Sequence, residues 1–254
     1  MKYNNIPIFI INLKTSKTRR EYIEKQFHTL MTENEIALPY SFFKAINGKE
    51  TPDFYLFKKY NKIKRLNIKG NELNLSQLGC LASHYLLWIK CIELNQPIII
   101  LEDDATLKPN FLTVYHFCHQ PNNTFEFFWL CQNNSKNRKN KYIMTLSDGE
   151  TQLSQYYGGW GNATGYFITP TAAQKLVDYN KEWIYEADIS IDRYWENKIS
   201  YLGIEPPCIT PTNMESNIPI NKGKAQRTLF IRIRREYYKL IDNIKKTIYD
   251  KFIN

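Results

Sequence analysis

Three consecutive acids, Glu102, Asp103 and Asp104, directly follow the run Ile-Ile-Ile-Leu at residues 98–101. A short run of large aliphatic residues predicts a central strand buried on both faces, which is typical of α/β sheets with helices on each side. In an open sheet of this class, ligands bind beyond the carboxyl ends of the strands. Adjacent carboxylates repel each other by about 1 to 4 kcal/mol per pair near a protein surface, so we expect a positive group beside them.

Alternation along the strand places Glu102 and Asp104 on one side and Asp103 on the opposite side. Two carboxylates on one side offer hard oxygen ligands to Mg²⁺ or Mn²⁺, and these cations also bridge phosphates. The pattern therefore favours a divalent metal held by Glu102 and Asp104, together with a phosphorylated ligand. The alternative is a solvated turn or a helix cap.

Short apolar strands alternate with segments of helical spacing along most of the chain. The predicted strands cover residues 7–13, 40–46, 98–101, 125–131 and 164–168. The predicted helices follow Thr15 or Ser16, cover residues 78–92, run from Pro109 to about His119, and begin at Thr169-Pro170. This alternation predicts an α/β domain with a mainly parallel sheet in three layers, while the polar residues 49–75 predict a loop or small helices. The glycines and aromatics of residues 156–161 predict a mobile loop whose backbone approaches a ligand.

The chain of 254 residues suits one such domain with a short appendage, and its 43% apolar residues exclude global disorder. No apolar run approaches the roughly 20 residues that a membrane-spanning helix needs. The N-terminus shows no secretory signal, so we expect a cytoplasmic protein. The cysteines form no C-x-x-C pair, and the spacing of Cys80 with His84 and of His116 with His119 matches no zinc pattern. We therefore expect reduced, mostly buried cysteines.

The net charge of +9 is concentrated near the C-terminus. Residues 222–254 hold ten Lys and Arg against three acids, a net of +7 that leaves +2 for residues 1–221. In this segment apolar residues recur every three or four positions, at Phe230, Ile233, Tyr237, Ile241, Ile244, Ile248 and Phe252. We predict a domain over residues 1–221 followed by a basic amphipathic helix over residues 222–254, which suits an anionic membrane surface. Docking on its own domain is the alternative, and we expect no nucleic-acid partner.

Several segments join the acidic strand in a characteristic order. They are residues 10–13 (IINL) with Arg19-Arg20, residues 43–48 (FKAING), residues 78–88 (LGCLASHYLLW), residues 98–104 (IIILEDD), and residues 165–168 (GYFI) with Ala172-Ala173. Over residues 6–210 the sequence resembles glycosyltransferase family 25, the lipooligosaccharide glycosyltransferases. The resemblance implies a GT-A-like, Rossmann-type fold. It also implies inverting transfer of a hexose from UDP-galactose or UDP-glucose to a lipooligosaccharide or other surface glycan. Together with the basic C-terminal helix, this leads us to expect the protein at the inner face of the cytoplasmic membrane.

In this family the acidic strand end looks like a DxD motif. On that resemblance Asp104, with Glu102 directly or through water, holds Mn²⁺ or Mg²⁺ on the UDP diphosphate. Asp103 or Glu102 would touch the ribose or the sugar. A third metal ligand from residues 210–216 stays open, because residues 213–216 are similar to a late element of the family but lack its adjoining His.

Other donor contacts follow from the same resemblance. Asn12 and Leu13, at the end of the first strand, would meet the uridine. Arg19 lies in the first turn of a predicted helix, where a cation is unfavourable unless an anion is near, and would meet the donor phosphates. Ser83 and His84 match the Ser-His pair of the family, and Ser83 would lie at the donor. For His84 we expect a structural, hydrogen-bonded role, with a contact to the sugar as the alternative.

Inverting transfer needs a base that takes the proton of the acceptor hydroxyl, and a carboxylate away from the metal suits this role. Asp188 matches the late acidic position of the family and is our candidate, with Asp192 and Glu186 as rivals and a helix cap as the structural alternative. Two other functions use the same residues differently. One is a non-catalytic, membrane-attached saccharide-binding protein of the same fold, and the other is a metal-dependent phosphodiesterase.

Overall fold

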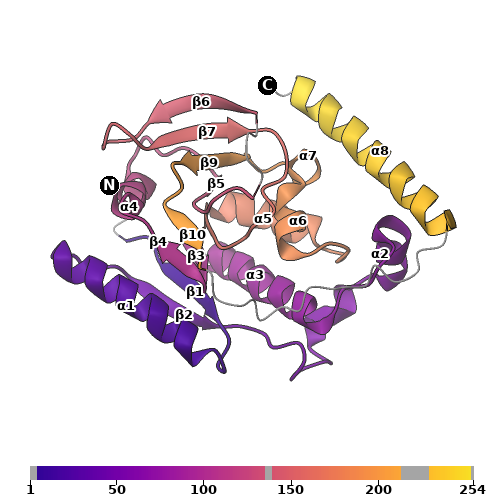
Figure 1. Ribbon diagram of the computed structural model, residues 1–254, viewed down its shortest axis with the longest axis horizontal. Coiled ribbons are helices and arrows are strands. Elements are labelled where there is room, and N and C mark those ends of the chain that lie inside the picture. The colour runs from indigo at the N-terminus through magenta and orange to yellow at the C-terminus, as the bar shows by residue number, and fades with distance from the viewer. Residues whose placement is uncertain (1–4, 135–138, 213–228, 253–254) are drawn as a thin grey trace.

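The acidic strand is β3 (Ile98–Glu102), and it lies inside an eight-stranded sheet (Figure 1). The computed structural model describes residues 5–134, 139–212 and 229–252. Across the sheet the strands are β2 (Tyr40–Lys44), β1 (Ile8–Asn12), β3, β8 (Gly165–Ile168), β5 (Phe127–Trp129), β9 (Leu202–Glu205), β7 (Gln152–Tyr156) and β6 (Asn140–Thr145). Each of the five predicted strands is present, whereas the sequence patterns do not predict β6, β7 and β9.

The sheet is mixed, so the prediction of a mainly parallel sheet is wrong. β1 pairs in parallel with β2 and β3, and β5 pairs in parallel with β9. β8 is antiparallel to both β3 and β5, and β7 is antiparallel to both β9 and β6. Parallel pairing needs a long crossover, usually a helix. Between β5 and β8 the chain instead forms the β6–β7 hairpin, and β8 enters the sheet in the reversed direction.

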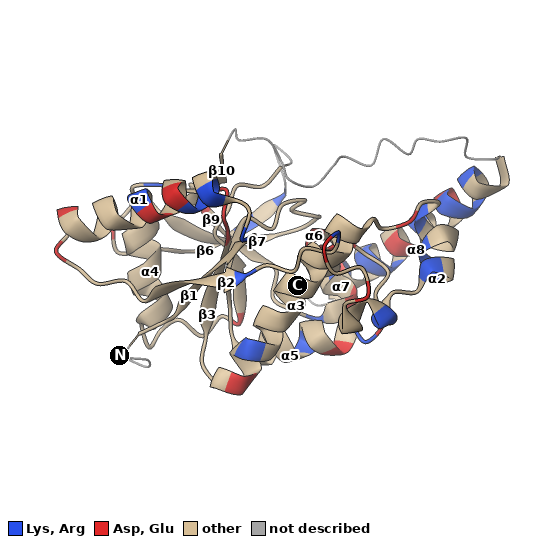
Figure 2. Cartoon of the chain, turned by 90° about the horizontal axis from the view of Figure 1, so that it is seen from below, with Lys and Arg blue, Asp and Glu red and all other residues tan. Residues whose placement is uncertain are grey.

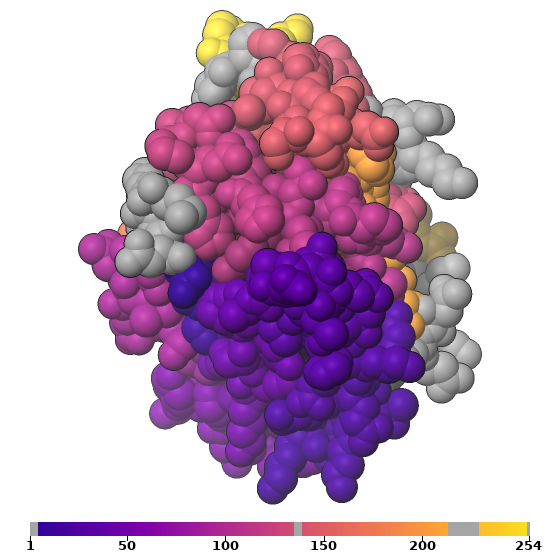
Figure 3. Space-filling model, turned by 90° about the vertical axis from the view of Figure 1, so that its left-hand side faces the viewer, coloured from indigo at the N-terminus to yellow at the C-terminus, as the bar shows by residue number. Residues whose placement is uncertain are grey.

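Helices cover both faces of the sheet, which gives the three expected layers (Figure 1). α1 (Lys17–Glu33) and α4 (Phe111–His119) lie on one face, where the Phe27 ring meets those of Tyr40 and Phe111. α3 (Leu75–Leu94) and α5 (Pro170–Tyr179) lie on the other face. In the space-filling view from the α1 side, the indigo N-terminal segment fills the lower part and the β6–β7 hairpin lies near the top (Figure 3).

Local sequence signals explain where two of these helices begin. α3 starts after Asn74, whose side chain accepts from the Gln77 N–H while the Gln77 side chain accepts from the Asn74 N–H. This reciprocal cap satisfies two backbone donors that a helix start leaves open. α5 starts after Thr169 with Pro170 in its first turn, as predicted. The helix that carries the Ser-His pair is therefore fixed at its N-terminal end by its own sequence.

Short elements complete the fold. The polar segment expected to form a loop or small helices contains η1 (Tyr55–Lys59) and α2 (Lys62–Lys69). The remaining elements are α6 (Ala187–Asp192), α7 (Tyr194–Asn197), and the antiparallel pair β4 (Ala105–Leu107) and β10 (Ile209–Pro211). The five cysteines are free and four of them are buried, as predicted. No helix of the described residues has the length and apolar character to cross a membrane.

The last helix, α8 (Leu229–Phe252), lies beside α2 and α7, and Figure 2 shows Lys and Arg in both α2 and α8 at one end of the molecule. A mixed face makes the contact with the domain: Asp242 pairs with Arg193, Asp250 accepts from the Tyr194 hydroxyl, and the Tyr249 ring packs against the core. Ile241, predicted to belong to the apolar face, lines a cavity under the helix. The side chains that point outward, each at least half exposed, form what we name the apolar stripe: Phe230, Ile233, Tyr237, Leu240, Ile244 and Ile248.

Candidate active site

Two cavities meet at the carboxyl end of β3. The first has a volume of about 500 Å³, the second has a volume of about 360 Å³, and Cys80, Glu102 and Asp104 line both. β1 and β3 are parallel neighbours, with Ile11 beside Glu102, so both strands deliver their last residues to this edge. The position agrees with the rule that ligands bind beyond the carboxyl ends of such strands.

The positive group expected beside the acids is Arg19. Its Nη1 lies 2.8 Å from Asp103 Oδ1 and 3.7 Å from Asp104 Oδ2. The Asn12 amide donates to Asp103 Oδ2 at 2.7 Å, so both oxygens of Asp103 have partners. Burial raises the pKa of Asp103, and the bonds from Arg19 and Asn12 oppose that rise. Asp103 therefore ties the start of α1 to β1 and β3, and the anion near the Arg19 helix turn is this carboxylate.

Asp104 has one oxygen without a protein partner. Its Oδ1 atom is buried, and no hydrogen-bond donor of the described residues reaches it. Burial and the charge of Glu102 raise the pKa of Asp104 to about 7. An unsatisfied buried oxygen is costly in native proteins, and a divalent cation would satisfy it. Glu102 and Asp104 therefore offer the hard oxygen ligands that Mg²⁺ or Mn²⁺ prefers.

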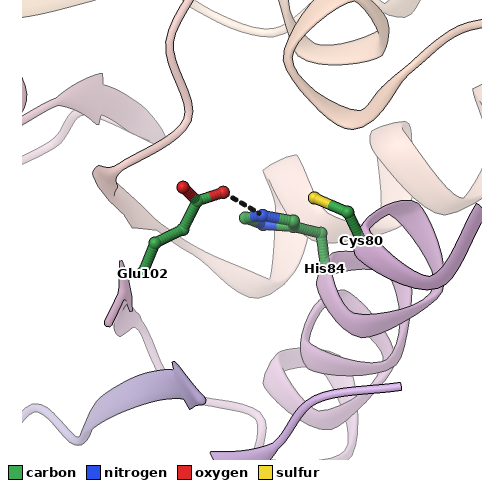
Figure 4. Close-up of side chains that lie close together, drawn as sticks. All are labelled: Cys80, His84 and Glu102. Atoms are coloured by element: carbon green, nitrogen blue, oxygen red, sulfur yellow. Dashed lines mark hydrogen bonds and ion pairs between the residues drawn. The ribbon is translucent and has the colours of Figure 1, made fainter. Parts of the chain in front are cut away.

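His84 of α3 contacts the Glu102 carboxylate (Figure 4). His84 Nε2 lies 3.2 Å from Glu102 Oε1, and the imidazole is fully buried. The Cys80 sulfur is close enough to both for the three side chains to resemble a metal cluster. Burial, with the charge of Glu102, raises the pKa of the Cys80 thiol well above its usual value, so the thiol is protonated when no metal ion is bound.

The other residues that the sequence assigns to the sugar donor do not all reach a cavity. Leu13, Arg19 and Ser83 line the first cavity, whereas Asn12 lies behind Asp103. The Ser83 hydroxyl donates to the Gly79 carbonyl at 2.8 Å and accepts from the Ile46 N–H at 2.9 Å. This contact fixes the chain after β2 against α3 and so forms one wall of the first cavity.

Gly79 allows that close approach, and the sequence reasoning gave it no physical role. A Cβ at this position would lie 2.3 Å from the Ile46 carbonyl oxygen and 2.9 Å from the Gly48 nitrogen. Gly48 and Gly79 lie in two of the segments that carry the family resemblance, residues 43–48 and 78–88. A glycine in each segment was the available sequence signal that the two backbones lie in contact.

The structure separates the three candidate bases. Both terminal nitrogens of Arg65 bind the Glu186 carboxylate, at 2.7 and 2.8 Å. Burial alone would raise the pKa of Glu186, but the pairing with Arg65 outweighs it and keeps that pKa below its usual value. Asp192 accepts from the Trp160 and Gly161 N–H groups and from the Tyr201 hydroxyl. Both side chains therefore hold the structure together.

Asp188 lines the second cavity, as do Glu102, Asp104 and the rival Glu186, whose carboxylate is paired with Arg65. One of its oxygens accepts from the N–H of the next residue, Ile189, at 2.8 Å. Burial raises the pKa of Asp188, with further rises from the nearby charges of Glu186 and Glu102. A carboxylate with a raised pKa beside a cavity has the properties that a general base requires.

The glycine-rich loop after β7 was expected to bring its backbone to a ligand. Its Trp160 and Gly161 N–H groups instead bind Asp192, although Gly161 and Asn162 of the same loop also line the second cavity. Residues 213–216, where a third metal ligand was left open, lie outside the described residues. Sequence reasoning missed Tyr166, whose hydroxyl contacts His84 Nδ1 at 2.9 Å from β8, because a core tyrosine carries no local signal of such a contact.

The chain thus has an α/β fold in which acidic residues at a strand end lie between two cavities, the place where proteins of this fold class bind small ligands. Residues 5–191 match the family model described as glycosyltransferase family 25 (LPS biosynthesis protein). The chain therefore belongs to glycosyltransferase family 25, as the sequence resemblance indicated.

Relatives carry related names. A protein of Acanthamoeba polyphaga mimivirus, named as a glycosyltransferase, is 32% identical over 68% of this chain and 53% of its own length. The lipooligosaccharide biosynthesis protein lic2B of Haemophilus influenzae is 33% identical over 40% of this chain and 35% of its own. A glycosyltransferase 25 family member of Drosophila melanogaster is 26% identical over 67% of this chain and 27% of its own. The chain thus spans about half or less of the length of these relatives.

Among solved structures, a glycosyltransferase involved in the glycosylation of the major capsid of PBCV-1 aligns with 93% of this chain and 99% of its own. The two are 8% identical with a TM-score of 0.45, a likeness too weak to support an inference.

Proposed function

We propose that this chain transfers a hexose, galactose or glucose, from a UDP-sugar to a hydroxyl group of a lipooligosaccharide or other surface glycan, with inversion and with the help of Mn²⁺ or Mg²⁺. One observation carries the proposal: Glu102 and Asp104, the latter with an unsatisfied buried oxygen, lie where two cavities meet. Family membership supports glycosyl transfer as the chemistry. A donor in one cavity and an acceptor in the other would meet at these carboxylates.

The first cavity suits the donor. Its volume of about 500 Å³ lies within the range of small-molecule sites. We assign Leu13, with Asn12 behind it, to the uridine side, and Arg19 to the phosphates. Ser83 shapes the wall between them, and Asp103 orients Arg19 and is the nearest acid for a ribose or sugar hydroxyl. The GT-A-like description of the fold belongs to the same proposal.

Glu102 and Asp104 would hold the cation, which when bound neutralises the negative charge that develops on the departing diphosphate. Asp188 would take the proton of the acceptor hydroxyl in the second cavity. Its rivals have partners of their own: Glu186, which also lines this cavity, pairs with Arg65, and Asp192 binds the loop after β7. The carboxylates thus divide into ligands for a cation, a base, and residues that hold the structure.

Two substitutions test this division. Asp104→Asn removes a charged oxygen ligand and should weaken binding of UDP with Mn²⁺ in calorimetric titrations and abolish transfer. Asp188→Asn should bind UDP and Mn²⁺ as the wild type does, yet lose about a hundredfold or more in transfer rate. Asp178→Asn, an exposed surface change outside both cavities, is the matched control.

The outcomes also separate the alternative functions. Near-normal transfer by Asp188→Asn would contradict its role as the base, and unchanged Mn²⁺ dependence in Asp104→Asn would contradict the metal site. Binding of UDP-sugars with neither transfer nor slow hydrolysis would favour a non-catalytic saccharide-binding protein. Hydrolysis of simple phosphodiesters would favour a phosphodiesterase.

We also propose that α8 holds the protein on the cytoplasmic face of an anionic membrane. The helix docks through a mixed face that holds Asp242 and Tyr249, and the apolar stripe points outward. Arg232 and Lys239 lie on the exposed surface of the same helix. Apolar side chains at the headgroup boundary with cations beside lipid phosphates are typical of interfacial helices.

Vesicle sedimentation tests the membrane proposal. The wild type should bind vesicles that contain anionic lipid, bind neutral vesicles weakly, and lose binding as salt rises. Ile244→Asp, which places a charge in the apolar stripe, should reduce binding. Its neighbour Asn243 is exposed and outside the stripe, so Asn243→Asp adds the same charge as a control. Equal loss in both variants would show that only net charge matters and would contradict a role for the stripe.

A further inference from the structure

A chain of hydrogen bonds runs from the core of the domain to Glu102. The Trp88 indole nitrogen lies 2.9 Å from the Tyr166 hydroxyl oxygen. That oxygen lies 2.9 Å from His84 Nδ1, and His84 Nε2 lies 3.2 Å from Glu102 Oε1. Trp88, Tyr166 and His84 are fully buried, while Glu102 borders both cavities. Figure 4 shows the last link, from His84 to one of the two Glu102 oxygens.

The chemistry of Trp88 fixes the direction of the first bond, and the directions of the other two follow from the arrangement that satisfies every buried group. An indole N–H can only donate, so the Tyr166 oxygen accepts from Trp88. Burial raises the pKa of Tyr166 well above its usual value, so its hydroxyl keeps its proton. That single proton is donated to His84 Nδ1, and a neutral imidazole with an accepting Nδ1 carries its own proton on Nε2. His84 Nε2 therefore donates to Glu102 Oε1.

Other proton arrangements leave a buried group unsatisfied. If His84 were doubly protonated, or if a metal ion occupied Nε2, its Nδ1 would carry a proton and donate to Tyr166. The Tyr166 hydroxyl would then receive two donors, and its own proton would face no acceptor in the chain of bonds. A buried donor without a partner costs about 1 to 3 kcal/mol. The same reasoning disfavours a metal ion shared by Cys80, His84 and Glu102.

We propose that His84, held as the neutral Nε2–H tautomer by Tyr166 and Trp88, is a positioning residue that fixes the Glu102 carboxylate where the two cavities meet. A neutral donor orients Glu102 without cancelling its charge, and one carboxylate oxygen remains for a ligand. Groups that orient a metal-binding side chain in this way commonly tune the affinity for the metal. This consequence rests on the proposed role of Glu102 as a cation ligand, whereas the tautomer does not.

His119 supplies an internal comparison. Its Nδ1 lies 2.8 Å from the Tyr115 carbonyl oxygen, which can only accept, and its Nε2 accepts from the Ile6 N–H at 3.0 Å. His119 is therefore the opposite, Nδ1–H tautomer. Two buried histidines of one chain should thus differ in the nitrogen that carries the proton.

Long-range ¹H–¹⁵N spectra of the histidine-labelled protein, at neutral pH and without any ligand, test the tautomers. We expect an Nε2–H pattern that disappears in His84→Gln and an Nδ1–H pattern that persists from His119. In Tyr166→Phe, His84 should lose its single fixed tautomer while His119 is unchanged. An Nδ1–H or doubly protonated His84 in the wild type would overturn the proposal. This measurement needs neither metal nor substrate, so it stands even if the proposed function fails.

Two substitutions of His84 test the effect on Glu102. A Gln amide nitrogen can replace Nε2 as the donor to Glu102, whereas an Asn amide reaches only to the position of Nδ1. Calorimetric titration of Mn²⁺ in the presence of UDP should give near-normal affinity for His84→Gln and a loss of about tenfold or more for His84→Asn. Equal affinities in variants of matched urea stability would overturn the positioning role. Absence of Mn²⁺ binding in the wild type would instead contradict the proposed function.

Discussion

A buried ion pair anchors α8 to the domain, and its loss should lower stability by a predictable amount. Arg193 Nη1 and Nη2 lie 2.7 and 2.6 Å from the two Asp242 oxygens, and only 5% of the Arg193 side chain is exposed. Glu196 binds the same guanidinium at 2.9 Å. We predict that Asp242→Asn, which keeps the shape of the side chain but removes its charge, lowers the free energy of unfolding.

The surroundings of Arg193 set the magnitude. Removal of one partner from a buried ion pair costs about 3 to 5 kcal/mol. Asp242 is 24% exposed and Glu196 still compensates the guanidinium charge, so the loss should lie at or just below the lower end of that range, at about 2 to 3 kcal/mol. For a protein of this size each kcal/mol lowers the melting temperature by about 2 to 4 °C, which gives a total of about 4 to 12 °C.

Urea denaturation followed by tryptophan fluorescence measures this change, and hydrogen exchange of the α8 backbone shows whether the helix detaches. Glu236→Gln is the matched control on the same helix. Its ion pair with Lys239 spans 3.7 Å between side chains that are each 68% exposed, and surface pairs of this kind contribute about 0 to 1 kcal/mol. Equal denaturation midpoints for Asp242→Asn and Glu236→Gln would refute the claim that Asp242 anchors the helix.

Two further predictions concern pH and Glu186. The folded pKa of Asp104, about 7, exceeds its usual 3.8, so the folded state binds this proton more tightly and stability without a divalent cation should fall as the pH rises from about 4 to 7. Asp104→Asn should reduce that slope in urea titrations, leaving the part that Asp103, Asp188 and Asp192 contribute through their own raised pKa values. Mn²⁺, which competes with the proton, should bind more tightly at pH 8 than at pH 6. Glu186→Gln should cost about 3 kcal/mol, because the charge of buried Arg65 loses its carboxylate partner while its hydrogen bonds to Asn71 and Ile184 remain. Because the folded pKa of Glu186 is lowered, the stabilisation from this pair should disappear as the pH falls below the usual 4.5, and a melting curve unaffected by Glu186→Gln would contradict both statements.

Much of the scaffold could be predicted because its signals are local. The apolar run before Glu102 has the length and composition of a buried strand, and Pro170 opens a helix wherever that segment lies. Strand direction is different, because it depends on how the chain returns to the sheet. β6 is mostly exposed, and β7, although largely buried, is mostly polar in sequence, so neither gives clear apolar alternation, and the hairpin that reverses β8 went unpredicted.

For the site, residue types and order were enough to find the acids but not to divide their roles. Glu186, Asp188 and Asp192 lie within one short segment and look equivalent in the sequence. Glu186 is paired with Arg65, which is 121 positions away, and Asp192 binds Trp160 and Gly161, which precede it by about 30 positions. Partners at such separations leave no trace in local patterns.

The sequence by itself determined the acidic strand, the helix starts, the order of motifs and the charge of the C-terminal segment, because each depends on neighbouring residues. Only the tertiary structure decided the mixed sheet, the face by which α8 docks, and the proton carried by His84. These features depend on groups that folding brings together from distant parts of the chain. A carboxylate becomes a structural partner, a cation ligand or a base according to the donors that surround it, and those donors are fixed by the packing of the helices against the sheet.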